Sequence, residues 1–101
     1  MSTSSDPGDR LIARRCLISG RVQGVYYRAS AAQRARAAGI TGHARNLPDG
    51  RVEVLACGPH GAVAEFVAWL WIGPAAAKVS DVTIEALELA YEELPQRFRT
   101  A

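Results

Sequence analysis

The apolar and small residues between positions 11 and 38 form two segments, and a glycine follows each of them. Residues 11–19 (LIARRCLIS) form an apolar-rich run that predicts a strand ending before Gly20. Residues 27–38 (YRASAAQRARAA) are rich in alanine and arginine, and their small residues recur at helical spacing. Gly39 follows, where a left-handed residue commonly ends a helix. The pattern therefore predicts a strand, a glycine-bounded loop at 20–25 and a helix.

The next segment alternates apolar and polar positions on both sides of a turn. Residues 40–46 and 51–57 each predict a strand, and the second carries valine and alanine at alternate positions. Residues 47–50 (LPDG) join them, because proline presets φ for a turn and glycine permits positive φ. A β-hairpin is therefore expected over residues 40–57, with Gly58-Pro59 breaking its second strand.

A second amphipathic run follows that hairpin. Residues 61–72 (GAVAEFVAWLWI) carry apolar side chains at i, i+3, i+4 and i+7, which predicts a helix that stops at Gly73-Pro74. Residues 79–89 alternate again and predict a strand, and residues 96–100 are expected to add a short one. The element order is therefore β-α-β-β-α-β with a possible terminal strand.

This order favours an α+β fold, the ferredoxin-like βαββαβ plait, in which a mostly antiparallel sheet carries both helices on one face. We expect residues 11–101 to form this single domain. Residues 1–10 are rich in serine, aspartate, proline and glycine, which predicts a flexible N-terminal tail. The topology supports many functions, so it predicts none of them by itself.

Composition narrows the class of protein further. The chain has 101 residues, of which 49% are hydrophobic and 22% charged, as in ordinary globular domains. Its longest apolar stretch, residues 66–72, is far shorter than the about 20 residues that cross a bilayer, and its N-terminus lacks the apolar segment of a secretory signal. We therefore expect a cytoplasmic protein with no membrane partner.

Charge is unevenly distributed along the chain. The net charge is +2, yet residues 10–51 carry nine arginines and one acid, whereas residues 52–101 carry three bases and seven acids. A positive half favours a negatively charged partner, such as a phosphate or a nucleic acid backbone. A solvated arginine-rich surface would give the same pattern, so charge alone does not decide between them.

The cysteines do not indicate a metal site. Cys16 and Cys57 lie far apart in the sequence, and no C-x-x-C is present. We expect two buried free thiols. A single disulfide remains the alternative, because the sequence does not reveal whether the two sulfur atoms meet.

One loop has the composition of an anion-binding site. Residues 20–28 (GRVQGVYYR) join the first strand to the first helix, and their two glycines let the backbone curl tightly. Successive N–H groups can then converge on an anion, supported by the positive end of the helix dipole. Arg28 can fold over that cradle and donate two parallel hydrogen bonds to phosphate oxygens. An ordinary glycine-containing turn followed by a surface arginine is the simpler alternative.

The whole string resembles the signature G-x-V-Q-G-V-x-F-R of the acylphosphatase family. A second family segment is matched by residues 42–53 (GHARNLPDGRVE), with Gly58 at the expected distance. Similarity also extends through Trp69-Leu70 and Gly73-Pro74, so the resemblance covers roughly residues 12–99. Two long motifs at the right separation make this resemblance specific.

The resemblance implies the ferredoxin-like plait and the hydrolysis of small acyl phosphates to a carboxylate and inorganic phosphate. It also implies that neither a metal nor a cofactor is used and that no covalent enzyme intermediate forms. The phosphate-binding arginine of the family falls on Arg28, and its water-orienting asparagine falls on Asn46. The amides of the phosphate cradle fall on Gln23, Gly24, Val25, Tyr26, Tyr27 and Arg28.

These roles agree with the chemistry of a mixed anhydride. A carboxylate is a good leaving group, so the reaction chiefly needs phosphate binding, charge neutralisation and a correctly placed water. The side chain of Asn46 can accept a hydrogen bond from water and donate one to the substrate. On local evidence alone, Asn46 could equally be a turn residue that bonds to its own backbone. We expect a monomer whose ligands are the acyl phosphate and inorganic phosphate.

Two residues depart from the family pattern. Tyr27 stands where the family usually has Phe or Met, so its hydroxyl needs a partner if the ring is buried. His43 stands where the family usually has an aromatic ring, and either packing or exposure would suit it. Both departures concern the packing behind the site more than the activity.

Two noncatalytic readings compete with the enzyme. RNA-recognition modules share this topology, but they need aromatic residues on a central strand, and residues 51–57 contain none. A regulatory or partner-binding plait that retains the loop is the other alternative. The sequence does not select among small, aromatic and carbamoyl acyl phosphates.

Overall fold

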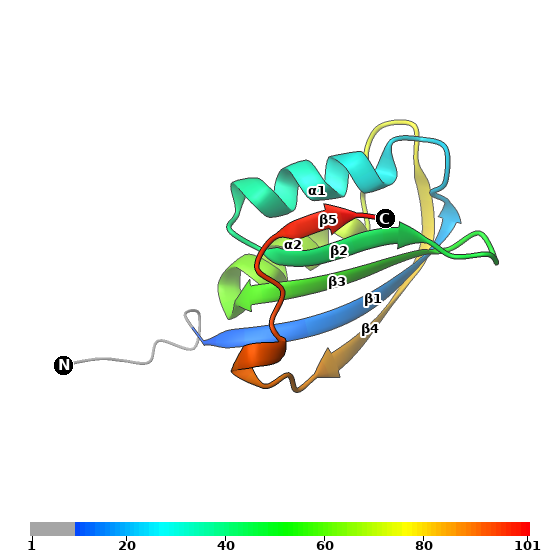
Figure 1. Ribbon diagram of the computed structural model, residues 1–101. Coiled ribbons are helices and arrows are strands. Elements are labelled where there is room, and N and C mark those ends of the chain that lie inside the picture. Colours follow the sequence, from blue (N-terminus) through cyan, green and yellow to red (C-terminus); the bar gives the residue numbers. More distant parts are fainter. Residues whose placement is uncertain (1–9) are drawn as a thin grey trace.

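One five-stranded sheet and two helices make up most of residues 10–101, the part of the chain that the computed structural model describes (Figure 1). The elements are β1 (Leu11–Arg21), α1 (Tyr27–Ala37), β2 (Thr41–Asn46), β3 (Val52–Pro59), α2 (His60–Leu70), β4 (Lys78–Leu87), the 3-10 turn η2 (Tyr91–Glu93) and β5 (Phe98–Thr100). The expected element order, including the short last strand, is confirmed.

The strand order is β4-β1-β3-β2-β5. β1 pairs antiparallel with β3 and β4, β2 pairs antiparallel with β3, and only β5 runs parallel to its neighbour β2. Both helices cover the same face of this sheet, α1 over β2 and β5 and α2 over β1 and β3 (Figure 1). The chain therefore has the predicted ferredoxin-like α+β fold with a mostly antiparallel sheet.

The core lies between the sheet and the two helices. Alternate residues of β1 and β3 face the helices, and the inner side of α1 is lined with alanines, which let that helix approach the sheet closely. The fully buried side chains include Cys16, Ile18, Ala31, Ala35, Val52, Val54, Val63, Leu70 and Phe98. Phe98 anchors β5, because its ring meets Phe66 edge to face at 6.0 Å between centroids.

The hairpin is confirmed, but its second strand is longer than expected. Gly58-Pro59 does not break β3: the strand continues to Pro59, which pairs with Leu11. Proline is tolerated there because it is the last residue of the strand, so the ladder loses only a terminal hydrogen bond. The main-chain N–H of His60 then continues the contact by donating to Arg10, at 2.7 Å.

Glycines end both helices in the left-handed conformation. Gly39 follows α1 with φ +73°, and Gly73 follows α2 with φ +67°. A Cβ on Gly73 would lie 2.8 Å from the Cε2 atom of Tyr27. Gly73 therefore ends α2 and also makes room for a ring at the start of α1.

Cys16 and Cys57 are both free and buried, so the disulfide alternative is wrong. Burial raises the pKa of Cys16 to about 11 and also raises that of Cys57. No helix within residues 10–101 is long and apolar enough to cross a membrane. The predicted tail, residues 1–10, lies outside the described residues except for Arg10, which is exposed.

Candidate phosphate-binding site

The loop between β1 and α1 is built around two left-handed residues. Val22 is buried and anchors the loop to the core, Gly24 has φ +76°, and Tyr26 has φ +62°. Tyr26 is the one non-glycine residue with positive φ in the described part of the chain, and its side chain is 82% exposed. A bulky residue held in this region commonly marks a functional segment, because the conformation is unfavourable without a compensating role.

The loop leaves hydrogen-bond donors available at the start of α1. Tyr26 is the N-cap residue of α1, no side chain caps the helix, and the first turn holds no acidic residue. Within residues 10–101, no main-chain carbonyl or side chain accepts a hydrogen bond from the N–H groups of Gly24, Val25 or Tyr26. Uncapped N–H groups at a helix N-terminus form a favourable environment for an anion.

Gln23 connects this loop to the β2–β3 hairpin. Its side-chain Nε2 donates one hydrogen bond to the main-chain oxygen of Leu47 and one to that of Arg51, both at 2.9 Å. Leu47 directly follows Asn46, so the loop lies against the end of the strand that carries Asn46. The sequence predicted only a main-chain role for Gln23, and this side-chain contact was not predicted.

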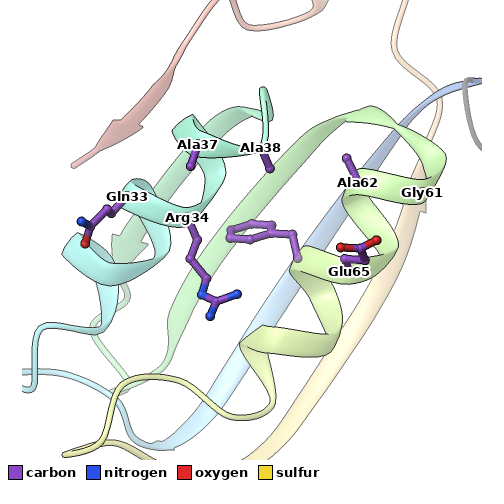
Figure 2. Close-up of a pocket in the computed structure, with 8 residues that line it drawn as sticks. Gln33, Arg34, Ala37, Ala38, Gly61, Ala62 and Glu65 are labelled. Carbon is purple, nitrogen blue, oxygen red and sulfur yellow. The ribbon is translucent and has the colours of Figure 1, made fainter.

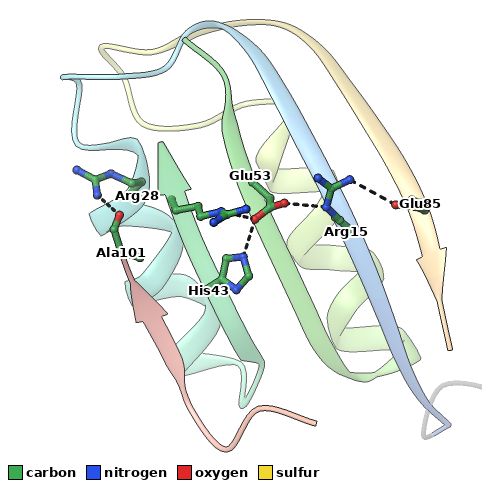
Figure 3. Close-up of polar contacts among 7 residues, drawn as sticks. Arg15, Arg28, His43, Glu53, Glu85 and Ala101 are labelled. Atoms are coloured by element: carbon green, nitrogen blue, oxygen red, sulfur yellow. Dashed lines mark hydrogen bonds and ion pairs between the residues drawn. The ribbon is translucent and has the colours of Figure 1, made fainter. Parts of the chain in front are cut away.

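Arg28 lies in the first turn of α1 and is half-buried. Its Nη1 donates a hydrogen bond to the main-chain oxygen of Ala101, at 2.6 Å (Figure 3). Ala101 in turn donates its N–H to the carbonyl of Ala44 on β2, at 3.0 Å. The guanidinium therefore lies near the same strand that ends at Asn46.

Asn46 is the last residue of β2, pairs with Val52 in the hairpin register, and is exposed. Its side chain bonds to no other group in residues 10–101, so the turn-residue alternative, in which it satisfies its own backbone, has no support from the hydrogen bonds. The amide is available to a ligand at the corner where the loop, α1 and β2 meet.

A charged cluster on β1, β2 and β3 was not predicted from the sequence. Glu53 on β3 is 3% exposed and accepts hydrogen bonds from Arg15 at 2.7 Å, His43 at 2.8 Å and Arg45 at 2.6 Å (Figure 3). Burial acts to raise the pKa of Glu53, but these three hydrogen bonds outweigh it and hold the pKa at about 2. The cluster joins β1, β2 and β3 on the face of the sheet opposite the helices.

The register of the hairpin contains the signal that could have revealed this cluster. Arg45 lies directly opposite Glu53 across the β2–β3 pair, and His43 is two residues from Arg45 on the same face. His43, where the family usually has an aromatic ring, is half-buried and bonds to a carboxylate. Glu53 thus contacts the strand that carries Asn46 and bonds to none of the loop residues 22–26, which we call the anion loop after their proposed role.

Tyr27, the first residue of α1, directly follows the loop and anchors it to the core. Its ring is buried, and its hydroxyl donates to the main-chain oxygen of Leu70 at 2.5 Å, so the predicted need for a partner is confirmed. Burial raises the pKa of this hydroxyl, which keeps it protonated as a donor. The bond ties the first turn of α1 to the last turn of α2.

A separate groove of about 860 Å³ lies between α1 and α2 and contains no predicted site residue (Figure 2). Arg34 and Glu65 lie on its two walls, and alanines and Phe66 form its apolar part. Arg34 places its Cζ atom 5.1 Å from the centre of the Trp69 ring. The anion loop and Asn46 lie elsewhere, so we do not assign this groove to the same site.

Comparisons with known proteins identify the family of this chain. The Acylphosphatase family model matches residues 14–100. The acylphosphatase of Chromohalobacter salexigens is 56% identical over 77 residues, covering 73% of this chain and 86% of the relative. That of Halorhodospira halophila is 61% identical over 71 residues, covering 70% and 77%. The solved structure of an acylphosphatase from Coxiella burnetii superimposes with a TM-score of 0.83 at 34% identity, covering 90% of this chain and 93% of that one.

The chain belongs to the acylphosphatase family, and it is a hydrolase of that family. The resemblance carried by residues 20–28 and 42–53 is therefore confirmed.

Proposed function

We propose that this protein hydrolyses small acyl phosphates at the corner formed by the loop, Arg28 and Asn46. The observation that carries this assignment is the placement of uncapped N–H groups, at the start of α1, beside the end of β2. The loop amides of residues 23–28 bind the phosphoryl oxygens, and Arg28 neutralises their charge. No metal or cofactor takes part in this proposal.

Arg28 retains enough donors for this role. A guanidinium has five N–H groups, and the bond to Ala101 uses one of them. The others include the planar pair that fits two phosphate oxygens. The contact with Ala101 restrains the guanidinium, which lowers the entropic cost of placing it against the substrate.

Asn46 places the nucleophile. Its amide oxygen accepts a hydrogen bond from a water molecule, whose oxygen attacks phosphorus in line with the leaving carboxylate. The new bond joins the water oxygen to phosphorus, and the broken bond joins phosphorus to the carboxyl oxygen. The electron pair leaves with the carboxylate, so no general acid is needed, and the water protons pass to phosphate and solvent.

We also propose that residues 11–101 act as one monomeric domain in the cytoplasm. Its ligands would be a small acyl phosphate and inorganic phosphate, with neither nucleic acid nor membrane as a partner. The face of the sheet opposite the helices supports the exclusion of RNA, because β3 presents Glu53 and Leu55 there and no aromatic ring for stacking.

The test is phosphate release from acetyl, benzoyl and carbamoyl phosphate, with Arg28→Ala as the control. We expect turnover that the control lacks and that inorganic phosphate inhibits competitively. Phosphate binding without turnover on any of the three compounds would favour the noncatalytic alternative. The relative rates within the panel would identify the preferred acyl group.

A further inference from the structure

We propose that the side chain of Gln23 is a positioning residue, which fixes the bound phosphoryl group relative to the water held by Asn46. This inference rests on the proposed function and adds a role that the family resemblance did not assign. Gln23 would act by joining the anion loop to the turn between β2 and β3, without touching the substrate through its side chain.

The side chain of Gln23 makes a double hydrogen bond. Both acceptors of Gln23 Nε2 belong to one turn: the N–H of Leu47 donates to the carbonyl of Arg51 at 2.8 Å, and that of Gly50 donates to the carbonyl of Leu47 at 3.1 Å. The glutamine therefore holds the two ends of a closed turn, and any movement of this turn relative to the loop must stretch one of its two bonds.

This connection between the loop and the turn stands alone among the described residues. Within residues 10–101, no other hydrogen bond joins loop residues 22–26 to residues 46–51. The main chain of Gln23 begins the cradle, and Asn46 directly precedes Leu47. The Gln23 side chain thus links two predicted parts of the site. One is the set of main-chain N–H groups that would bind phosphate, and the other is the side-chain amide of Asn46 that would hold water.

The amide group of Gln23 has no donor left for a ligand. A glutamine NH₂ has two donors, and here both are used by carbonyl oxygens. Only the acceptor Oε1 remains, and an acceptor gains nothing from a phosphoryl oxygen. The side chain is therefore suited to hold the turn and unsuited to bind phosphate, which distinguishes its role from that of its own main-chain N–H.

Loss of the Gln23 hydrogen bonds should slow the chemical step of the reaction. In-line attack depends steeply on the separation and angle of the reacting atoms, and a misplacement of about 1 Å can cost on the order of 100-fold in rate. Phosphate binding depends on the loop and Arg28, which keep their own contacts when the glutamine bonds are removed. Loss of the Gln23 side chain should therefore lower kcat much more than phosphate affinity.

The experiment compares Gln23→Met, which keeps the length but removes both donors, with Gln33→Met on the exposed side of α1 as the matched control. We expect Gln23→Met to lower kcat on acetyl phosphate roughly 30- to 100-fold. The inhibition constant of inorganic phosphate should change less than about 3-fold, because one lost positioning contact leaves the binding groups in place. Gln33→Met should match the wild type in both.

A double-mutant cycle then separates positioning from a general structural effect. In the Asn46→Ala background no water is held, so Gln23→Met should cost no more than about 2-fold, because residues that act as a unit are non-additive. Full additivity of the two effects would overturn the proposal, as would a rise in the phosphate inhibition constant that equals the fall in kcat. Should Gln23→Met fail to fold, Gln23→Asn is measured instead, since its shorter amide cannot bridge both carbonyls, and the same outcomes apply.

Failure of the proposed function would be recognised separately. If the wild type hydrolyses none of the acyl phosphates, the activity is refuted while the connection itself remains testable by amide hydrogen exchange. Gln23→Met should speed exchange at Leu47 and Gly50 at least 10-fold relative to Gln33→Met. Unchanged exchange at both positions would refute the connection, whatever the activity.

Discussion

The Nη1 atom of Arg28 lies 2.6 Å from the main-chain oxygen of Ala101, 73 positions further along the chain. The bond links the first turn of α1 to the end of the segment that adds β5 beside β2 (Figure 3). It restrains the one cation that the proposed site uses for phosphate, so the C-terminal segment contributes to the site without carrying a reactive group.

Removal of Ala101 should therefore weaken catalysis moderately. Without its acceptor, the Arg28 guanidinium must be ordered by the substrate alone, and we expect kcat/KM to fall about 3- to 10-fold. The fold should survive, because Phe98 stays buried and its carbonyl accepts two hydrogen bonds from Arg36. Steady-state kinetics with a thermal melt checks both points, and an unchanged kcat/KM would show that the contact has no functional role.

Arg28→Ala should abolish measurable turnover, because it removes the cation over the phosphate cradle. Arg28→Lys should restore little, since a lysine ammonium cannot form two parallel hydrogen bonds from one plane. Initial rates on acetyl phosphate test this prediction. Activity near that of the wild type in the lysine variant would refute the bidentate role.

Asn46→Ala should lower kcat by at least about 100-fold while the inhibition constant of inorganic phosphate changes little, because the variant loses water placement and keeps the anion loop. Kinetics with phosphate as the inhibitor separates the two quantities. The opposite pattern, weak phosphate binding with normal kcat, would assign Asn46 to binding.

Glu53 should make the stability of the protein depend on pH in the acid range. Its pKa of about 2 lies below the ordinary value of 4.5, so the unfolded chain binds more protons. Its contribution is therefore complete above about pH 4.5 and decreases as the pH falls towards 2, by on the order of 2 kcal/mol at pH 3.

Urea unfolding at pH 6 and pH 3 measures this loss. Glu53→Gln should be less stable at pH 6, because Arg15 and Arg45 lose their buried partner, and it should lose much less on acidification. Glu85→Gln is the matched control, since Glu85 is an exposed partner of Arg15 at 3.5 Å. Equal pH dependence in the wild type and Glu53→Gln would contradict the assignment.

Gly42→Ala should destabilise the sheet severely. Gly42 has φ +140°, and a Cβ there would lie 1.8 Å from the main-chain oxygen of Leu55, so β2 and β3 would have to separate. We expect a loss of at least about 3 kcal/mol, or failure to fold.

Gly50→Ala is the control for Gly42→Ala. Gly50 also has positive φ, at +95°, but a Cβ there would meet nothing within 4 Å. The strained left-handed backbone conformation is then the only cost, and it should lower the free energy of unfolding by about 1–2 kcal/mol. Similar losses of unfolding free energy in the two variants would show that the close approach of the strands does not decide the outcome.

Local patterns were sufficient for most of the fold. The helical spacing in residues 27–38, the turn residues 47–50 and the glycines at 39 and 73 predicted elements that the structure contains, because each depends on neighbours a few positions away. Pro59 was misjudged for the same reason: a proline suggests a break, and only the pairing with Leu11 shows that it ends β3.

The features of the candidate site also fall into two groups: those that the local sequence predicts and those that only the fold brings together. The sequence by itself determined the loop before α1 that we propose to bind an anion, since two glycines and an arginine at the start of a helix are local features, and it pointed to Arg28 and Asn46 through two motifs. Only the tertiary structure decided how Gln23 reaches Leu47, how Arg28 meets Ala101 and why Glu53 is buried. Each of these contacts joins residues from different strands or helices, so it forms only when the sheet register brings their side chains within hydrogen-bond distance.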